Sequence, residues 1–143
     1  PTTTKRRAIM AQYLLDTNIC IYISKYQPPQ IKQKFLQHTM AELNISIITL
    51  GELYFGAQKS QAKDKALKVI RQLAKTVQIA HLDQNVATHY ADIRYQLQQQ
   101  GNIIGNNDLW LAAHARANNW IMVTNNEKEF LRVQGLSVQN WTQ

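Results

Sequence analysis

Short apolar runs alternate with longer amphipathic segments along the chain. The apolar runs cover residues 13–15, 44–48, 79–82, 121–124 and 136–141, and their β-branched and aliphatic content predicts buried strands. Between them, apolar residues recur at helical spacing and predict helices over 19–24, 31–36, 49–57, 58–76, 86–97 and 108–117, with Gly101 ending the helix before it. Strands that alternate with helices predict an α/β layered fold with a largely parallel central sheet.

The length and composition indicate one domain. The chain has 143 residues, of which 45% are hydrophobic, enough for an ordinary buried core. Residues 10–16 read like a natural start, so we predict that residues 1–9 are a cloning remnant or an upstream extension and that 10–143 form a single domain. Without the three basic residues of that segment, the net charge falls from +7 to +4, which favours a phosphate-bearing partner without requiring one.

The single cysteine, Cys20, excludes an intramolecular disulfide and fits a reducing cytosol. Its neighbours Ile19 and Ile21 predict a buried, unreactive side chain. No apolar stretch reaches the length of about 20 residues that a transmembrane helix needs. We therefore expect a cytoplasmic protein with no membrane segment.

Three acidic residues lie at the ends of apolar runs: Asp16, Glu52 and Asp108. Ligands of parallel α/β sheets bind at the carboxyl ends of the strands, so we expect these three carboxylates to face one crevice. Carboxylates that converge repel one another unless a cation offsets their charge, and Mg²⁺ or Mn²⁺ prefers oxygen ligands. Each acid alone also fits a helix-capping role; Glu52, for example, could complete a capping box with Thr49 as the N-cap.

Four segments, in order, resemble the motifs of PIN-domain ribonucleases, specifically the VapC toxins of bacterial toxin–antitoxin pairs. They are LLDTN at 14–18, ITLGEL at 48–53, IGNNDLWLAAHA at 104–115, and VTNN at 123–126 with the tail that follows it. The resemblance runs from Met10 to about Trp141. It implies a PIN-like, Rossmann-like three-layer fold, with a mostly parallel sheet flanked by helices.

The resemblance also implies an activity. Members of this family are Mg²⁺-dependent endoribonucleases, with Mn²⁺ as a substitute, that stop translation, often by cutting tRNA. Motif matching makes Asp16, Glu52 and Asp108 the catalytic, metal-binding acids. The hydroxyls of Thr17 and Thr124 become candidates for orienting carboxylates or water.

The chain departs from the family pattern after its fourth predicted strand. Many PIN domains carry a fourth acid there, whereas this chain has Asn125 and Asn126. We favour Glu129 as the replacement, while Glu127, an amide such as Asn125, or no replacement stays open. The departure favours one tightly held Mg²⁺, with a second ion arriving together with the RNA phosphate.

The resemblance implies protein partners as well. These are a second copy of the chain, in a homodimer, and a cognate VapB-type antitoxin whose disordered tail wraps the toxin. Operator DNA would be bound only through the antitoxin. A groove lined by Tyr22, Ile23, Phe35 and Leu36 is the predicted contact for that tail.

Several other residues have two interpretations. The lysines and arginine between Lys59 and Lys75 form either a solvated helix face or a surface for RNA phosphates. The three tryptophans at 110, 120 and 141 are predicted to be mainly core or interface residues, with base stacking as the alternative. His114 lies six residues after Asp108, on another side of the helix, and is predicted to be structural.

Two other functions compete with the ribonuclease hypothesis. The first is a catalytically weak PIN scaffold that acts mainly in an autoregulatory toxin–antitoxin complex on DNA. The second is a phosphohydrolase of another α/β family, which would need an Asp-x-Asp pair after the first strand. Asn18 stands two residues after Asp16 and disfavours that second reading.

Overall fold

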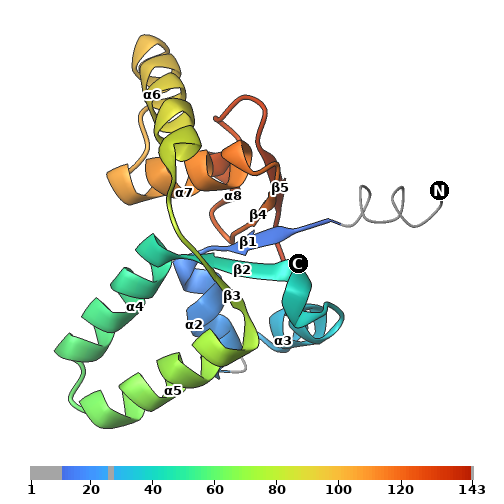
Figure 1. The fold of residues 1–143 in the computed structure, drawn as a ribbon, viewed down its shortest axis with the longest axis vertical. Coiled ribbons are helices and arrows are strands. Elements are labelled where there is room, and N and C mark those ends of the chain that lie inside the picture. The colour runs from blue at the N-terminus through green and yellow to red at the C-terminus, as the bar shows by residue number, and fades with distance from the viewer. Residues whose placement is uncertain (1–10, 26–27, 143) are drawn as a thin grey trace.

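A computed structural model describes residues 11–25 and 28–142, so the predicted remnant or extension at 1–9 lies outside the described residues. Its strands are β1 (Tyr13–Leu15), β2 (Leu43–Ser46), β3 (Gln78–Ala80), β4 (Ile121–Val123) and β5 (Ser137–Gln139). They form one sheet in the order β3-β2-β1-β4-β5 (Figure 1), and every neighbouring pair is parallel. The predicted parallel sheet is therefore confirmed.

The helices lie on both faces of the sheet. They are α2 (Thr17–Lys25), α3 (Pro29–Leu36), α4 (Ile47–Lys59), α5 (Lys63–Thr76), α6 (Gln84–Gln99), α7 (Asn106–Ala117) and α8 (Glu127–Phe130), with one 3-10 turn at Met40–Glu42. Figure 1 shows α4 and α5 on one side of the strands and α6 and α7 on the other. This is the three-layer arrangement that the sequence predicted. In the described part of the chain, no helix is both long and apolar enough to cross a bilayer.

Strand alternation divides the core into two clusters. Tyr13 and Leu15 pack with residues of α2 to α5, whereas Leu14 packs with residues of α6 and α7. Successive side chains of a strand point to opposite faces of the sheet, so a three-residue strand serves both layers. All three residues of β1 are buried, which explains why the run reads as continuously apolar.

The second strand ends earlier than predicted. It stops at Ser46, and Ile47 already opens α4. The Ser46 hydroxyl accepts a hydrogen bond from the Ile48 N–H at 3.1 Å, which makes Ser46 the N-cap. Thr49 is therefore a buried residue inside the helix, and the predicted capping box with Glu52 is wrong.

The predicted helix over 58–76 is two helices. Its first residues belong to α4, which ends at Lys59, and α5 begins at Lys63. Ser60 has an extended backbone, and its hydroxyl accepts a hydrogen bond from the Ala62 N–H at 3.1 Å. A serine that bonds to nearby backbone competes with helical hydrogen bonds, which accounts for the break.

Other boundaries differ by a few residues. The last long helix starts at Asn106, two residues before the predicted start at Asp108. Gly101 follows the end of α6 with φ +64°, a left-handed conformation that glycine adopts at low cost, so the predicted stop is confirmed. The short helix α8 and the 3-10 turn at Met40–Glu42 were not predicted, because elements of three or four residues leave no periodic pattern.

Candidate active site

Asp16 lies at the centre of the site, where β1 ends and α2 begins. Its side chain is 5% exposed. Asp16 Oδ2 accepts a hydrogen bond from the Thr124 hydroxyl at 2.7 Å, and Oδ1 accepts one from the Thr17 N–H at 2.6 Å. Burial raises the pKa of Asp16; the bonds from Thr124 and Thr17 oppose this, and the charges of Glu52 and Glu129 add to it.

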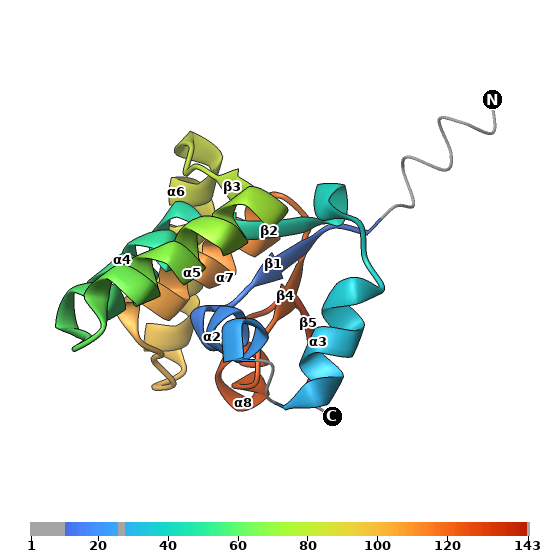
Figure 2. The same cartoon turned by 90° about the horizontal axis from the view of Figure 1, so that it is seen from below.

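Glu52 reaches the same place from α4. Its Oε1 accepts a hydrogen bond from the Thr17 hydroxyl at 3.0 Å, and that hydroxyl also lies 3.5 Å from the Thr49 hydroxyl. Thr17 therefore contacts two acids, through its N–H to Asp16 and through its hydroxyl to Glu52. Figure 2 shows α2 near the end of β1, with α4 alongside it. The role of Thr17 in orienting carboxylates stays a prediction, which these two hydrogen bonds support.

Asp108 and Glu129 face each other across the site. Asp108 lies in the first turn of α7, and Glu129 lies on α8. Burial, the negative charge of Asp16 and a hydrogen bond with Glu129 raise the pKa of Asp108 to about 7. Two carboxyl groups share a hydrogen bond only when one of them holds a proton. Asp108 and Glu129 therefore share one proton when they are hydrogen-bonded to each other.

Glu127 and the two asparagines occupy other positions. Glu127 accepts a hydrogen bond from Asn140 at 3.0 Å and so contacts the C-terminal segment. Asn125 donates to the Tyr22 hydroxyl at 3.0 Å, while its Oδ1 is buried without a hydrogen-bond partner. The Asn126 N–H donates to the Thr124 hydroxyl at 2.9 Å. Of the candidates for a fourth acid, Glu129 is the one whose charge raises the pKa values of both Asp16 and Asp108.

The donor set suits a hard divalent cation. Asp16 lies between β1 and α2, and Glu52, Asp108 and Glu129 lie on α4, α7 and α8. Each of the other three raises the pKa of Asp108. A bound cation would reverse this repulsion, and carboxylate oxygens are the ligands that Mg²⁺ prefers. Among residues 11–25 and 28–142, no group of three or more His, Cys, Asp or Glu side chains is placed so that it could hold a metal ion. Mg²⁺ itself usually takes only one or two direct carboxylates and keeps several waters.

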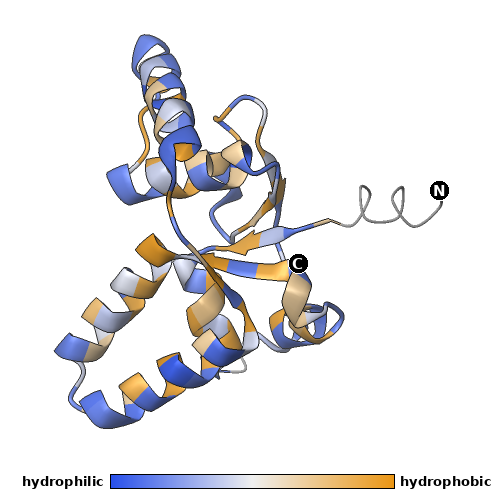
Figure 3. Cartoon of the chain, viewed as in Figure 1, coloured by the Kyte–Doolittle hydropathy of each residue, from blue (hydrophilic) through white to orange (hydrophobic). Residues whose placement is uncertain are grey.

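Several residues with two interpretations are structural. His114 is 1% exposed, its Nδ1 lies 2.9 Å from the Ser46 hydroxyl, and burial lowers its pKa. Cys20 is fully buried, as predicted. Trp141 is 1% exposed and stacks on His38 with ring centroids 5.2 Å apart, so its ring is not available to an RNA base. Figure 3 shows hydrophilic residues recurring along α5, where the lysines are exposed to solvent.

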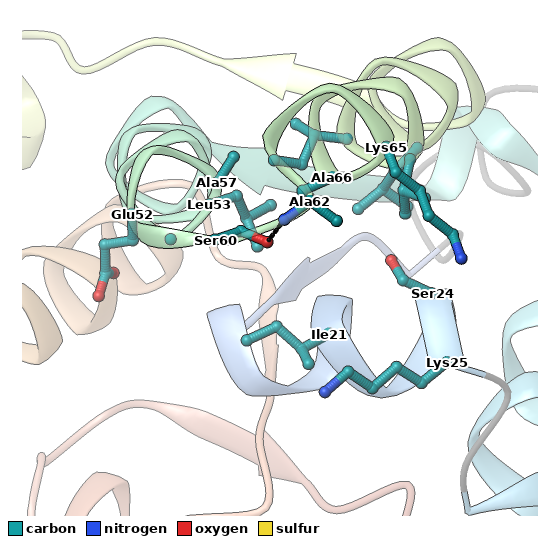
Figure 4. A pocket seen from close by; sticks show the side chains of 14 residues that line it. Ile21, Ser24, Lys25, Glu52, Leu53, Ala57, Ser60, Ala62, Lys65 and Ala66 are labelled. Carbon is teal, nitrogen blue, oxygen red and sulfur yellow. Dashed lines mark hydrogen bonds between the residues drawn. The ribbon is translucent and has the colours of Figure 1, made fainter.

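The four residues predicted to line the antitoxin groove do not all line the same groove. Ile23 and Phe35 line one groove with Lys32, Lys65 and Lys68. Tyr22 instead accepts the hydrogen bond from Asn125, and Leu36 is 69% exposed. A second groove of about 580 Å³ runs between α2, α4 and α5 and is mainly apolar (Figure 4). The sequence did not predict this groove, because its lining comes from three separate helices.

Comparisons with known proteins agree with this geometry. A parallel sheet with a cluster of acids at its carboxyl edge defines a PIN domain, and the PIN-domain family model matches residues 13–136. The chain is 40% identical over 132 residues to "Ribonuclease VapC2" of Haemophilus influenzae, covering 92% of this chain and 99% of that protein. It is 39% identical over 133 residues to "tRNA(fMet)-specific endonuclease VapC" of Shigella flexneri, covering 93% and 100%.

Solved structures of toxin–antitoxin complexes are also similar. The DNA-bound VapBC complex of Salmonella typhimurium contains a chain with a TM-score of 0.87 and 36% identity, covering 92% of this chain and 99% of that one. VapBC2 of Rickettsia felis, bound to a promoter DNA fragment, gives a TM-score of 0.85 and 36% identity, covering 90% and 98%. The chain therefore belongs to the VapC ribonucleases of the PIN-domain family.

Proposed function

We propose that this chain is a Mg²⁺-dependent endoribonuclease toxin that cuts RNA, with tRNA as the substrate class, and thereby inhibits translation in the cytoplasm. The observation that carries the proposal is the group of Asp16, Glu52, Asp108 and Glu129 at one end of the sheet. Burial raises the pKa values of Asp16 and Asp108, and the charges of Glu52 and Glu129 raise both further. A site that concentrates this much negative charge cannot receive an RNA phosphate until a cation is bound. The tRNA assignment is supported by the name of the Shigella relative.

The four acids would have two different roles. Asp16, Asp108 and Glu129 would hold Mg²⁺, which supplies charge stabilisation for phosphate displacement and an activated water. Glu52, which accepts a hydrogen bond from the Thr17 hydroxyl, would ligate the ion or act as the base for the attacking water. In-line hydrolysis would leave a 5′-phosphate and a 3′-hydroxyl. Our preferred stoichiometry is one tightly held ion, with a second ion that arrives with the RNA. A Mn²⁺ titration without RNA tests this stoichiometry, and two tight sites would contradict it.

The test is a cleavage assay with a matched pair of substitutions. Purified protein is incubated with total tRNA and Mg²⁺, and the new 5′ ends are sequenced. Asp16→Asn should abolish cleavage, because the amide brings no charge to the centre of the site. Asp64→Asn makes the same chemical change on the exposed face of α5 and should cleave like the unaltered protein.

Two results would contradict the proposal. Full activity in Asp16→Asn would show that the cleavage does not come from this site. No cleavage by the unaltered protein, with binding to antitoxin and DNA intact, would favour the catalytically weak scaffold. The DNA-bound VapBC complexes of similar structure are the observation that keeps this second candidate in view.

We propose a VapB-type antitoxin as the partner, in keeping with the VapBC complexes. The apolar groove between α2, α4 and α5 is the proposed contact for its tail. Figure 4 shows Glu52 at one end of the groove and Lys65 toward the other, so an apolar segment with a basic residue at one end matches it. The homodimer also stays a prediction, which light scattering of the isolated toxin would test.

A further inference from the structure

Tyr90 of α6 contacts α7 on either side of Asp108. Its hydroxyl donates a hydrogen bond to Asn106 Oδ1 at 2.6 Å. Its ring stacks on Trp110, with centroids 3.8 Å apart and planes inclined by 12°. Asn106 and Trp110 are four residues apart and share one face of the helix, whereas Asp108, midway between them, projects from roughly the opposite face. The two contacts therefore fix the rotation of the helix that carries Asp108.

Arg94 orients the Tyr90 hydroxyl. Arg94 Nη1 donates to that hydroxyl at 2.9 Å, and the guanidinium carbon lies 5.9 Å from the centroid of the Tyr90 ring. Because the hydroxyl oxygen accepts from Arg94, its own proton is directed to Asn106. Tyr90 and Arg94 are one helical turn apart, so the rigid backbone of α6 holds both ends of this arrangement.

Asp108 needs such support more than an ordinary surface acid does. When Asp108 is ionised, as a metal ligand must be, the charges of Asp16, Glu52 and Glu129 oppose its placement at the site. Gly105 precedes the helix and provides no side-chain cap. The contacts from Tyr90 supply a restraint on the far side of the helix.

We propose that Tyr90 is a positioning residue that holds Asp108 at the site before metal arrives. Arg94 orients the Tyr90 hydroxyl, Asn106 accepts the hydrogen bond from that hydroxyl, and Trp110 stacks on the Tyr90 ring. In this role Tyr90 contacts neither the ion nor the RNA. It restricts the conformational freedom of Asp108 in the metal-free protein, so that less of this freedom is lost when the metal binds. The inference rests on the proposed function, because only there is Asp108 a metal ligand.

The test compares metal affinity in single-atom and side-chain deletions. Tyr90→Phe removes the hydroxyl but keeps the ring, and Asn106→Ala removes the acceptor but leaves the stack on Trp110 in place. Tyr95→Phe is the matched control, because Tyr95 lies on the same helix and is 65% exposed. Mn²⁺ binding is measured by calorimetry without RNA, and cleavage rate is measured against Mn²⁺ concentration.

Tyr90→Phe and Asn106→Ala should each weaken Mn²⁺ binding about three- to tenfold, the range expected for one hydrogen bond that orients a metal ligand. Saturating Mn²⁺ should restore most of the cleavage rate, with KM for RNA unchanged, which a general loss of structure would not do. Tyr95→Phe should match the unaltered protein. Affinities within twofold of the unaltered protein in both variants would overturn the proposal.

An Asp108→Asn variant distinguishes a wrong positioning role from a wrong metal site. If Asp108→Asn weakens Mn²⁺ binding and the Tyr90 and Asn106 variants do not, the positioning role is wrong and the metal site stands. If Asp108→Asn leaves Mn²⁺ binding unchanged, the metal site itself is wrong, and the positioning role falls with it. If Tyr90→Phe is too unstable to assay, Asn106→Ala decides, because its substitution site is exposed and alanine suits a helix.

Discussion

Replacing Thr124 by valine tests how the buried charge of Asp16 is sustained. Thr124 is fully buried, and its hydroxyl donates to Asp16 Oδ2 at 2.7 Å while accepting from the Asn126 N–H at 2.9 Å. Valine has nearly the same shape, so the substitution removes both hydrogen bonds without opening a cavity. Thr124→Ser keeps a hydroxyl and is the matched control.

The expected loss of stability follows from those two bonds. A hydrogen bond to a charged group contributes about 1.5–3 kcal/mol, and an N–H left without a partner adds a further cost. We therefore expect Thr124→Val to lower the free energy of unfolding by about 2–4 kcal/mol at neutral pH in EDTA. Cleavage should fall about 10- to 100-fold, as for other groups that orient metal ligands.

The stability loss in Thr124→Val should depend on pH, in a direction that follows from the ionisation of Asp16. The Thr124 hydroxyl lowers the pKa of Asp16, so it stabilises the ionised carboxylate. The stability difference between the unaltered protein and Thr124→Val should be present where Asp16 is ionised and should shrink as the pH falls through its raised folded-state pKa. Urea denaturation at several pH values measures this difference. A loss below about 0.5 kcal/mol at neutral pH, or an equal loss in Thr124→Ser, would refute the reasoning.

Three further predictions concern other parts of the molecule. Because the folded-state pKa of Asp108 is raised from 3.8 to about 7, the folded protein holds a proton that the unfolded chain has lost, so in EDTA Asp108 should make stability fall as the pH rises between these values. Urea denaturation of Asp108→Asn should show a flatter profile, and an unchanged profile would contradict the assignment. Trp141→Ala should cost about 3–5 kcal/mol in urea denaturation, because the ring is buried against His38 and Tyr13; a cost below about 1 kcal/mol would argue against that packing. If the α5 lysines contact RNA phosphates, Lys68→Gln in an Asp16→Asn background should reduce the slope of log K against log salt by about 0.7, whereas an unchanged slope would leave Lys68 as part of a solvated face.

The sequence by itself determined the fold class and singled out Asp16, Glu52 and Asp108 as the candidate acids. Apolar runs separated by helical spacing predicted the parallel sheet, since burial on both faces leaves an unbroken run such as Tyr13–Leu15. The acids that close these runs were visible because carboxylates are scarce in this chain. Local signals were weaker at element boundaries. Ser46, and not Thr49, caps α4, because either hydroxyl satisfies the local pattern and only the packing of β2 decides where the strand ends.

Tertiary structure decided which residues act together. The motif resemblance named Glu129 and Thr124 as candidates, but no spacing in the sequence pairs Glu129 with Asp108 or Thr124 with Asp16. These pairs meet only when β4 lies beside β1 and α8 follows it. The same holds for Tyr90, which the sequence shows merely as one apolar position of an amphipathic helix. Its contacts with Asn106 and Trp110 arise from the packing of α6 on α7. Periodicity specifies which face of an element is buried, whereas the electrostatics of a site depend on distances between elements that only the folded chain sets.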